Sequence, residues 1–158
     1  TGSFLVTNNQ MDVTSDGFVF WNTRFNANQE VYVTLRAIDL GSQEIDLLLK
    51  SQSPTTPDGG LIEVWYDVAG SRAQVWTVTP GQGWTQHGAD IPVTFAVGDR
   101  FGARARGDGF VEVYKNSTLV GTRDVRSWIY YATTGYTGLW MMSSRNTLLD
   151  DFGGGNAP

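Results

Sequence analysis

Alternation of apolar and polar residues is clearest in residues 61–79, LIEVWYDVAGSRAQVWTVT. A period of two sends neighbouring side chains to opposite faces of a strand, so this segment predicts a β-hairpin with one apolar face. A turn closed by Ala69–Arg72 places Val68 opposite Ala73, and the same register places Trp65 opposite Trp76. The polar face of this hairpin carries Glu63, Trp65, Asp67, Arg72, Gln74 and Trp76.

Similar short runs fill the rest of the chain, separated by turn sequences such as Ser15-Asp16-Gly17 and Gly107-Asp108-Gly109. No segment shows the i, i+3, i+4 apolar spacing of an amphipathic helix. Many strands without alternating helices predict an all-β fold, an antiparallel two-sheet β-sandwich. The expected strands are 4–6, 10–14, 18–21, 29–38, 43–51, 61–68, 72–79, 91–95, 100–106, 110–115, 118–125, 136–142 and 148–152.

The two tryptophans of the 61–79 hairpin suggest a binding surface. Aromatic rings stack on the C–H faces of sugars, while surrounding polar groups exchange hydrogen bonds with the hydroxyls. We therefore predict a ligand-binding face that contains Trp65 and Trp76. Two other interpretations stay open: the pair stabilises the hairpin by about 0.5–1 kcal/mol, or it faces a neighbouring domain.

A second polar strip is predicted on the hairpin formed by residues 100–115. Phe101 and its apolar neighbours alternate with Arg104, which lies opposite Glu112, and Tyr114 points the same way. These side chains are candidates to line the same binding surface as the tryptophans, together with Tyr32 and Arg36. The alternative is a solvated sheet face with an ordinary ion pair.

Composition narrows the class of protein. The chain has 158 residues, of which 41% are hydrophobic and 17% charged, as expected of one globular domain. A net charge of −5 disfavours nucleic acid as a partner, and no apolar run approaches the roughly 20 residues of a membrane span. The absence of cysteine removes disulfides and thiolate chemistry. We expect one domain over residues 1–152 and a glycine-rich tail or linker over 153–158, with further domains beyond it.

Three segments carry a resemblance to a known family: EIDLLLKSQS, GDRFGARARGDGFVEVYKN and GYTGLWMMSSRNTLLDDFGGG. Together they resemble the concanavalin A-like, laminin G-like β-sandwich domains that are appended to large bacterial extracellular proteins. The resemblance implies a jelly roll of two antiparallel sheets, a secreted or cell-surface location, and in many members a carbohydrate-binding module with a structural calcium ion. The expected partner is a polysaccharide or oligosaccharide.

The same resemblance indicates a metal site at the last strand. An acidic residue there binds Ca²⁺ in similar modules, and Asp150 and Asp151 occupy that position here. Oxygen ligands suit calcium. Strand alternation sends the two carboxylates to opposite faces, so we expect one of them, Asp150, to point inward. The alternative is that both end the strand at the surface.

Catalysis finds less support in the sequence. One enzyme family of this fold carries E-x-D-x-(x)-E on one strand, and Glu44-Ile45-Asp46 begins such a motif, but Leu48 or Leu49 takes the place of the last carboxylate. His87 is the only histidine and is expected at the surface of a loop. The predicted function is therefore a non-catalytic carbohydrate-binding module. A glycoside hydrolase or polysaccharide lyase, and a structural or adhesive module of a surface protein, are the alternatives.

Overall fold

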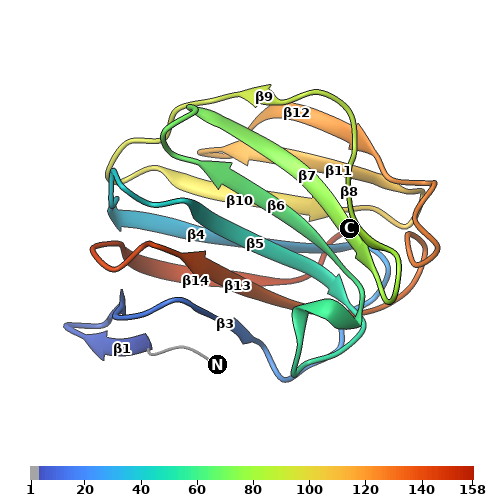
Figure 1. Ribbon diagram of the computed structural model, residues 1–158, viewed down its shortest axis with the longest axis horizontal. Helices are drawn as coiled ribbons and strands as arrows, with labels where there is room; N and C mark the ends of the chain where they lie inside the picture. Colours follow the sequence, from blue (N-terminus) through green and yellow to red (C-terminus); the bar gives the residue numbers. More distant parts are fainter. Residues whose placement is uncertain (1–3) are drawn as a thin grey trace.

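The computed structural model describes residues 4–158, which form two stacked β-sheets (Figure 1). Every strand pair in this part of the chain is antiparallel. Three of these pairs contain a local shift of register. The predicted all-β, two-sheet sandwich is confirmed. In the described residues, no helix is long and apolar enough to cross a membrane.

Sheet A is the more distant layer in Figure 1 and contains seven strands. In spatial order they are β1 (Phe4–Thr7), β2 (Gln10–Val13), β14 (Leu148–Asn156), β4 (Gln29–Ala37), β10 (Arg100–Ala105), β11 (Phe110–Lys115) and β12 (Thr118–Asp124).

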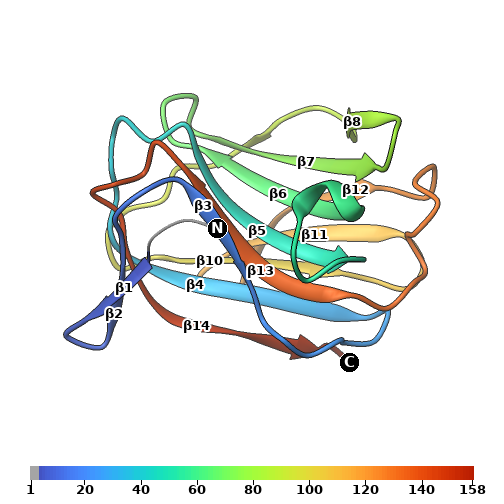
Figure 2. The same cartoon turned by 60° about the horizontal axis from the view of Figure 1, so that its bottom comes forward.

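Sheet B is the nearer layer, and Figure 2 shows the two layers from a second direction. Its strands in spatial order are β3 (Gly17–Phe20), β13 (Tyr136–Met142), β5 (Glu44–Ser51), β6 (Leu61–Asp67), β7 (Arg72–Thr79) and β8 (Gly83–Gln86), and β9 (Ile91–Pro92) pairs with β7. A short 3₁₀ turn, Pro57–Gly59, precedes β6.

The main core lies between the sheets and is built from the inward-facing side chains of strands in both sheets. In β6 the residues Ile62, Val64 and Tyr66 are buried, and in β10 Phe101 and Ala103 are buried. These are the apolar members of each alternation, because a buried face must exclude polar side chains. The remaining side chains of both strands consequently point outward, away from the opposite sheet.

The glycine-rich C-terminal segment corrects the expected domain boundary. Gly153–Asn156 belong to β14 and pair with Gln29–Tyr32 of β4, so they are part of the sandwich and not a linker. Glycine permits this close pairing: a Cβ atom added to Gly154 would lie 2.3 Å from the carbonyl oxygen of Glu30. The short strand β8 is also absent from the expected set, since its sequence GWTQ lacks an apolar alternation.

Candidate functional site

The β6–β7 hairpin forms as predicted, but its register differs from the expected one. Trp65 lies opposite Gln74, and Trp76 lies opposite Glu63, so the two indoles are diagonal neighbours and not a directly opposed pair. The last pair before the loop is Asp67 with Arg72, whose Nε donates to an Asp67 carboxylate oxygen at 2.8 Å. The expected Trp65–Trp76 pairing is therefore wrong.

Both indoles are half-buried and held by hydrogen bonds within the sheet. Trp65 donates its Nε1 proton to the carbonyl oxygen of Gln43 at 2.9 Å, and Trp76 donates to Oε1 of Gln74 at 2.9 Å. The orientation of each ring is thereby fixed, and one edge of each faces protein. Stacking on a ligand would have to use the remaining exposed ring surface.

The polar residues predicted beside these tryptophans are largely engaged with Asp90. Arg72 donates to one carboxylate oxygen of Asp90 at 2.7 Å, and Gln74 and Gln86 both donate to the other. These contacts, the hydrogen bond from the Gln86 side chain first, oppose the effect of burial and hold the pKa of Asp90 below its usual value. Arg72, Gln74 and Asp67 thus form a closed network along the edge of the hairpin.

The outer face of sheet B holds three carboxylates that the sequence did not bring together. Glu44 and Asp46 lie two residues apart on β5, and Glu63 lies on the neighbouring strand β6. One carboxylate oxygen from each falls within 4.8 Å of the others. Glu63 thus supplies from the next strand the third carboxylate that Leu48 and Leu49 do not supply on β5.

Aromatic side chains enclose this carboxylate group. Asp46 is paired with Trp65 on one side and with Trp140 of β13 on the other, and Trp76 flanks Glu63. Asp46 has no exposed surface, and burial raises its pKa well above the ordinary value. Burial, with a smaller contribution from the charge of Glu44, raises the pKa of Glu63 to about 8.

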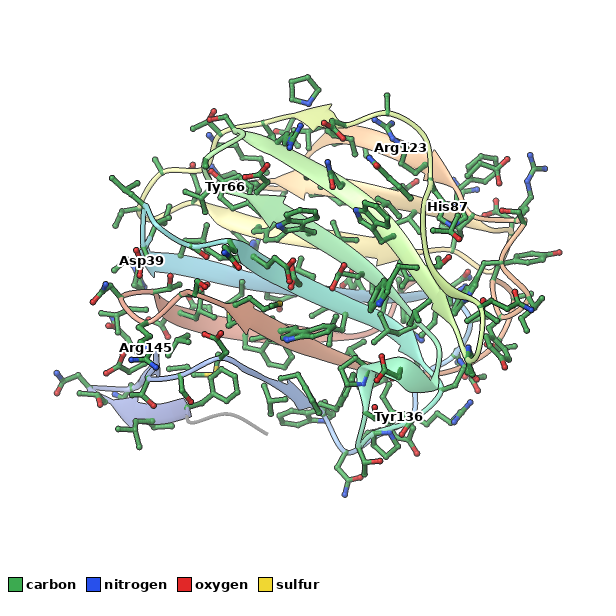
Figure 3. The ribbon with its side chains drawn as sticks, in the orientation of Figure 1. Asp39, Tyr66, His87, Arg123, Tyr136 and Arg145 are labelled. Atoms are coloured by element: carbon green, nitrogen blue, oxygen red, sulfur yellow. The ribbon has the colours of Figure 1, made fainter. Side chains whose placement is uncertain are left out.

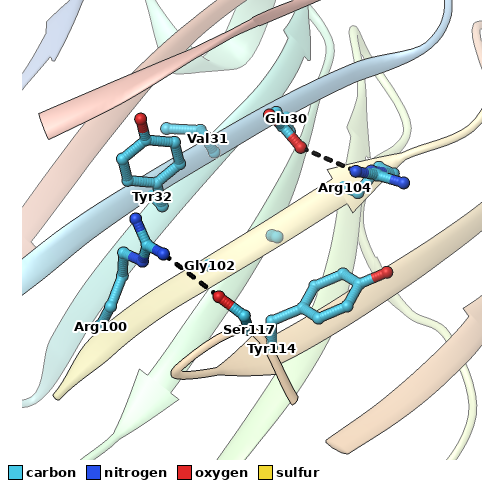
Figure 4. A pocket seen from close by; sticks show the side chains of 9 residues that line it. Glu30, Val31, Tyr32, Arg100, Gly102, Arg104, Tyr114 and Ser117 are labelled. Carbon is cyan, nitrogen blue, oxygen red and sulfur yellow. Dashed lines mark hydrogen bonds and ion pairs between the residues drawn. The ribbon is translucent and has the colours of Figure 1, made fainter. Parts of the chain in front are cut away.

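The opposite side of the molecule carries an open groove of about 390 Å³ on the outer face of sheet A (Figure 4). Gly102 lies at its floor, paired with Tyr32 of β4 on one side and Tyr114 of β11 on the other. Because glycine has no side chain, a hollow remains between the two phenol rings. The ring pair and the hollow together provide a slot bounded by aromatic side chains.

Charged side chains stand at the two ends of this groove. Arg100 lies 4.9 Å from the centre of the Tyr32 ring and donates to the Ser117 hydroxyl at 3.1 Å. Arg104, four residues further along β10, donates to a Glu30 carboxylate oxygen at 3.0 Å. The groove therefore presents cations, a carboxylate and a hydroxyl around its tyrosines (Figure 4).

A second hollow of about 490 Å³ adjoins the first at Arg104, which lines both. Glu112 lines the second hollow; it accepts a hydrogen bond from Tyr114 at 2.6 Å and pairs with Arg106 at 3.2 Å. Arg104 does lie opposite Glu112 in the strand register, as expected, but its ion pair is with Glu30. The two hollows are therefore neighbours on the outer face of sheet A, and together they are called the track.

The predicted binding residues thus divide between two faces. Glu63, Trp65, Asp67, Arg72, Gln74 and Trp76 lie on the outer face of sheet B, while Tyr32, Arg104, Glu112 and Tyr114 lie on the outer face of sheet A. The shared core separates the two faces. The expectation that all these side chains line one surface is therefore wrong, because a strand alternation does not say which sheet the strand joins.

Asp150 and Asp151 do not point to opposite faces as expected. Asp151 has a φ of 49°, and the register of β14 against β4 shifts between Asp150 and Gly153, which marks a bulge. Both carboxylates consequently reach Arg36: its Nε lies 3.1 Å from Asp150 and its Nη2 lies 3.7 Å from Asp151. A calcium ion at this position would have to compete with the guanidinium.

His87 also differs from expectation. It is only 6% exposed, and its Nε2 lies 2.8 Å from the Thr77 hydroxyl oxygen. Figure 3 shows it at the same edge of the sandwich as Arg123, whose Nε donates to the carbonyl oxygen of Ala89. His87, which directly follows β8, is therefore a packed structural histidine, and it does not line the groove on sheet A.

The sequence did not indicate that four other residues would line the groove. Arg100, Gly102 and Ser117 belong to no recognisable motif. Glu30 lies 74 residues from its partner Arg104 in the sequence. One available signal was a lone glycine inside a strand pattern, which often marks a close approach or an open site. Gly102 fits that description.

The fold is a two-sheet antiparallel β-sandwich of the concanavalin A-like type. The sequence matches no known family model and no curated protein, so the likeness rests on solved structures. A carbohydrate-binding module of family 66 from Bacillus subtilis aligns with a TM-score of 0.69 and 15% identity, over 99% of this chain and 92% of that one.

Two further solved structures share this fold. The Caenorhabditis elegans galectin LEC-6 aligns with a TM-score of 0.60 and 9% identity, over 96% of this chain and 99% of that one. A structure described with endo-acting O-glycanases of the human gut microbiota aligns with a TM-score of 0.63 and 11% identity, over 98% of this chain and 83% of that one. At these identities the likeness establishes the fold alone.

Proposed function

We propose that this protein is a non-catalytic glycan-binding module and that its glycan lies in the groove on sheet A. The observation that carries the proposal is the slot between Tyr32 and Tyr114 over Gly102. A pyranose or furanose ring presents apolar C–H faces and polar edges. Such a ring matches two aromatic side chains surrounded by donors and acceptors.

The polar groups at the groove suit sugar hydroxyls. Arg100 and Arg104 present donors, and Glu30 and Ser117 present acceptors at opposite ends of the slot. The adjoining hollow beyond Arg104 gives room for a second residue of the glycan. An oligosaccharide or a polysaccharide segment therefore fits the track better than a single sugar.

The known structures support the same class of ligand. The neighbours described as a carbohydrate-binding module and as galectins share this fold. We extend the glycan-binding role to this chain as part of the proposal, with a secreted or cell-surface location and attachment to further domains. Modest affinity at one site would gain from such attachment through avidity.

The test compares the two faces of the sandwich. We would measure retention of the protein on a panel of insoluble polysaccharides and on a glycan array, using Tyr32→Ala and Tyr114→Ala against Trp65→Ala and Trp76→Ala. The tyrosine variants are expected to lose retention by about tenfold or more, or ~1.4 kcal/mol, since each substitution removes an aromatic face on which a sugar ring would stack. The tryptophan variants are expected to retain the glycan.

Three outcomes would contradict the proposal. Loss in the tryptophan variants alone would assign the glycan to sheet B. Release of soluble products from a retained glycan would indicate an enzyme, and absence of binding across the whole panel would favour a structural or adhesive module. Circular dichroism of each variant checks that the fold is intact.

A further inference from the structure

Asp46, which lies between two other carboxylates on the outer face of sheet B, is buried without a partner. Asp46 has no exposed surface, and neither of its carboxylate oxygens has a hydrogen-bond partner. Glu63 beside it is 6% exposed. Among the described residues, neither a lysine nor an arginine forms a salt bridge with Glu44, Asp46 or Glu63.

Such an arrangement is costly unless something compensates it. Buried carboxylates in native proteins are normally hydrogen-bonded, paired with a cation or bound to a metal. Burial raises the pKa of all three groups, and Glu44 adds a repulsive contribution to both Asp46 and Glu63. The strands hold the three groups together nevertheless, because the β5–β6 register fixes Asp46 beside Trp65 and Glu63 beside Leu48.

We propose that Glu44, Asp46 and Glu63 bind one calcium ion. Calcium contacts its oxygen ligands at about 2.3–2.6 Å, so two ligands of the same ion lie at most about 5 Å apart. The three carboxylates meet that condition, with one oxygen from each within 4.8 Å of the others. Bidentate coordination and water would complete the six to eight oxygens that calcium usually takes.

The surroundings favour calcium over other cations. The chain has no cysteine, and its single histidine, His87, already contacts Thr77, so the nitrogen and sulfur ligands of zinc sites are missing. Magnesium keeps much of its water shell and demands a rigid octahedron. Trp65 and Trp140 flank Asp46 in the sheet and Trp76 flanks Glu63. The half-buried Glu44 is the most accessible of the three carboxylates, so it offers the approach for ion and water.

This site is separate from the acidic pair at Asp150 and Asp151. That pair lies on β14 of sheet A and faces Arg36, whereas the present group lies on sheet B and faces no cation. It is separate from the glycan groove as well, which lies on the outer face of sheet A. The calcium proposal therefore stands or falls independently of the proposed function.

The test is a calcium titration of EDTA-treated protein, with isothermal titration calorimetry and tryptophan fluorescence as the two readouts. Trp65, Trp76 and Trp140 flank the carboxylates, so ion binding is expected to change the emission as well as release or absorb heat. We expect one ion per chain, bound at least tenfold more tightly than magnesium. Asp46→Asn and Glu63→Gln are each expected to weaken calcium binding by tenfold or more.

The double variant Asp150→Asn/Asp151→Asn is the matched control and is expected to bind calcium like the parent. Loss of binding in this control but not in Asp46→Asn would place the ion on β14 and overturn the proposal. Absence of any response up to about 10 mM calcium, above the range of weak extracellular modules, would overturn it too. Both single variants alter a buried carboxyl group, so circular dichroism must show that each is folded; if one is not, the other still decides the question.

Discussion

Tyr32 of β4 packs directly over Gly153 of β14, so that a Cβ atom added to Gly153 would lie 2.5 Å from the tyrosine hydroxyl oxygen. The glycine-rich end of the chain therefore does more than continue the sheet. It lets the Tyr32 ring lie low against β14, where the ring forms one wall of the groove.

Replacement of Gly153 by alanine tests this relationship. In Gly153→Ala the new methyl group is expected to displace the Tyr32 ring and to lower glycan affinity by about tenfold, or ~1.4 kcal/mol. Retention on the glycan identified for the parent protein is the measurement. Gly41→Ala is the control, since a Cβ there would meet only Asp39, at 3.4 Å. Equal retention by Gly153→Ala and the parent would show that the position of Tyr32 is unimportant for binding.

Filling the floor of the groove should separate stability from binding. A Cβ atom at Gly102 would lie 3.5 Å from Cβ of Tyr32 and 3.7 Å from Cβ of Tyr114, which are ordinary contacts. Gly102→Val is therefore expected to fold with a melting temperature at or above that of the parent, because valine favours strands. Its branched side chain occupies the hollow, so glycan retention is expected to fall below detection. A variant that still binds would mean that the glycan does not enter the slot.

The buried histidine predicts a dependence of stability on pH. Burial lowers the pKa of His87 below 6.5, although the nearby Asp124 opposes that shift. Below pH 6.5 the unfolded chain takes up this proton more readily than the folded chain, so folding stability is lost as the pH falls. One proton contributes at most about 1.4 kcal/mol per pH unit.

Urea unfolding of the parent and of His87→Gln measures the contribution of this proton to the free energy of unfolding. The pH range is roughly 5 to 7, which spans the ordinary pKa of histidine. The parent is expected to lose more stability than the variant on acidification. Parallel curves would indicate that His87 has the same proton affinity in the folded and unfolded chains. The comparison needs the variant because the raised pKa values of Asp46 and Glu63 add a pH dependence of their own, which is the same in both proteins.

Registers of a hairpin mark one limit of sequence-based prediction. Alternation correctly separated the buried Val64 from the outward-facing Trp65, because neighbouring side chains in a strand must point to opposite faces. A slide of the strands by two residues leaves every side chain on the same face. The pattern consequently cannot choose between Trp65 opposite Trp76 and Trp65 opposite Gln74; the Asp67–Arg72 contact at the turn accompanies the second.

The carboxylate group shows a second limit. The sequence displayed Glu44 and Asp46 together, because residues two apart share one face of a strand. It did not display Glu63, which joins them only when β6 pairs with β5 across an intervening loop. Interactions between strands depend on the pairing order and the register together, and neither can be read from the alternation of a single strand.

The sequence alone determined the all-β class, most strand positions and the buried face of each strand, because these follow from backbone periodicity and the exclusion of polar groups from a core. The tertiary structure alone decided which strands share a sheet. That choice put Tyr32, Gly102 and Tyr114 side by side on sheet A and the predicted Trp65 and Trp76 on the opposite side of the molecule. Partners so far apart along the chain meet only through the packing of the whole sandwich.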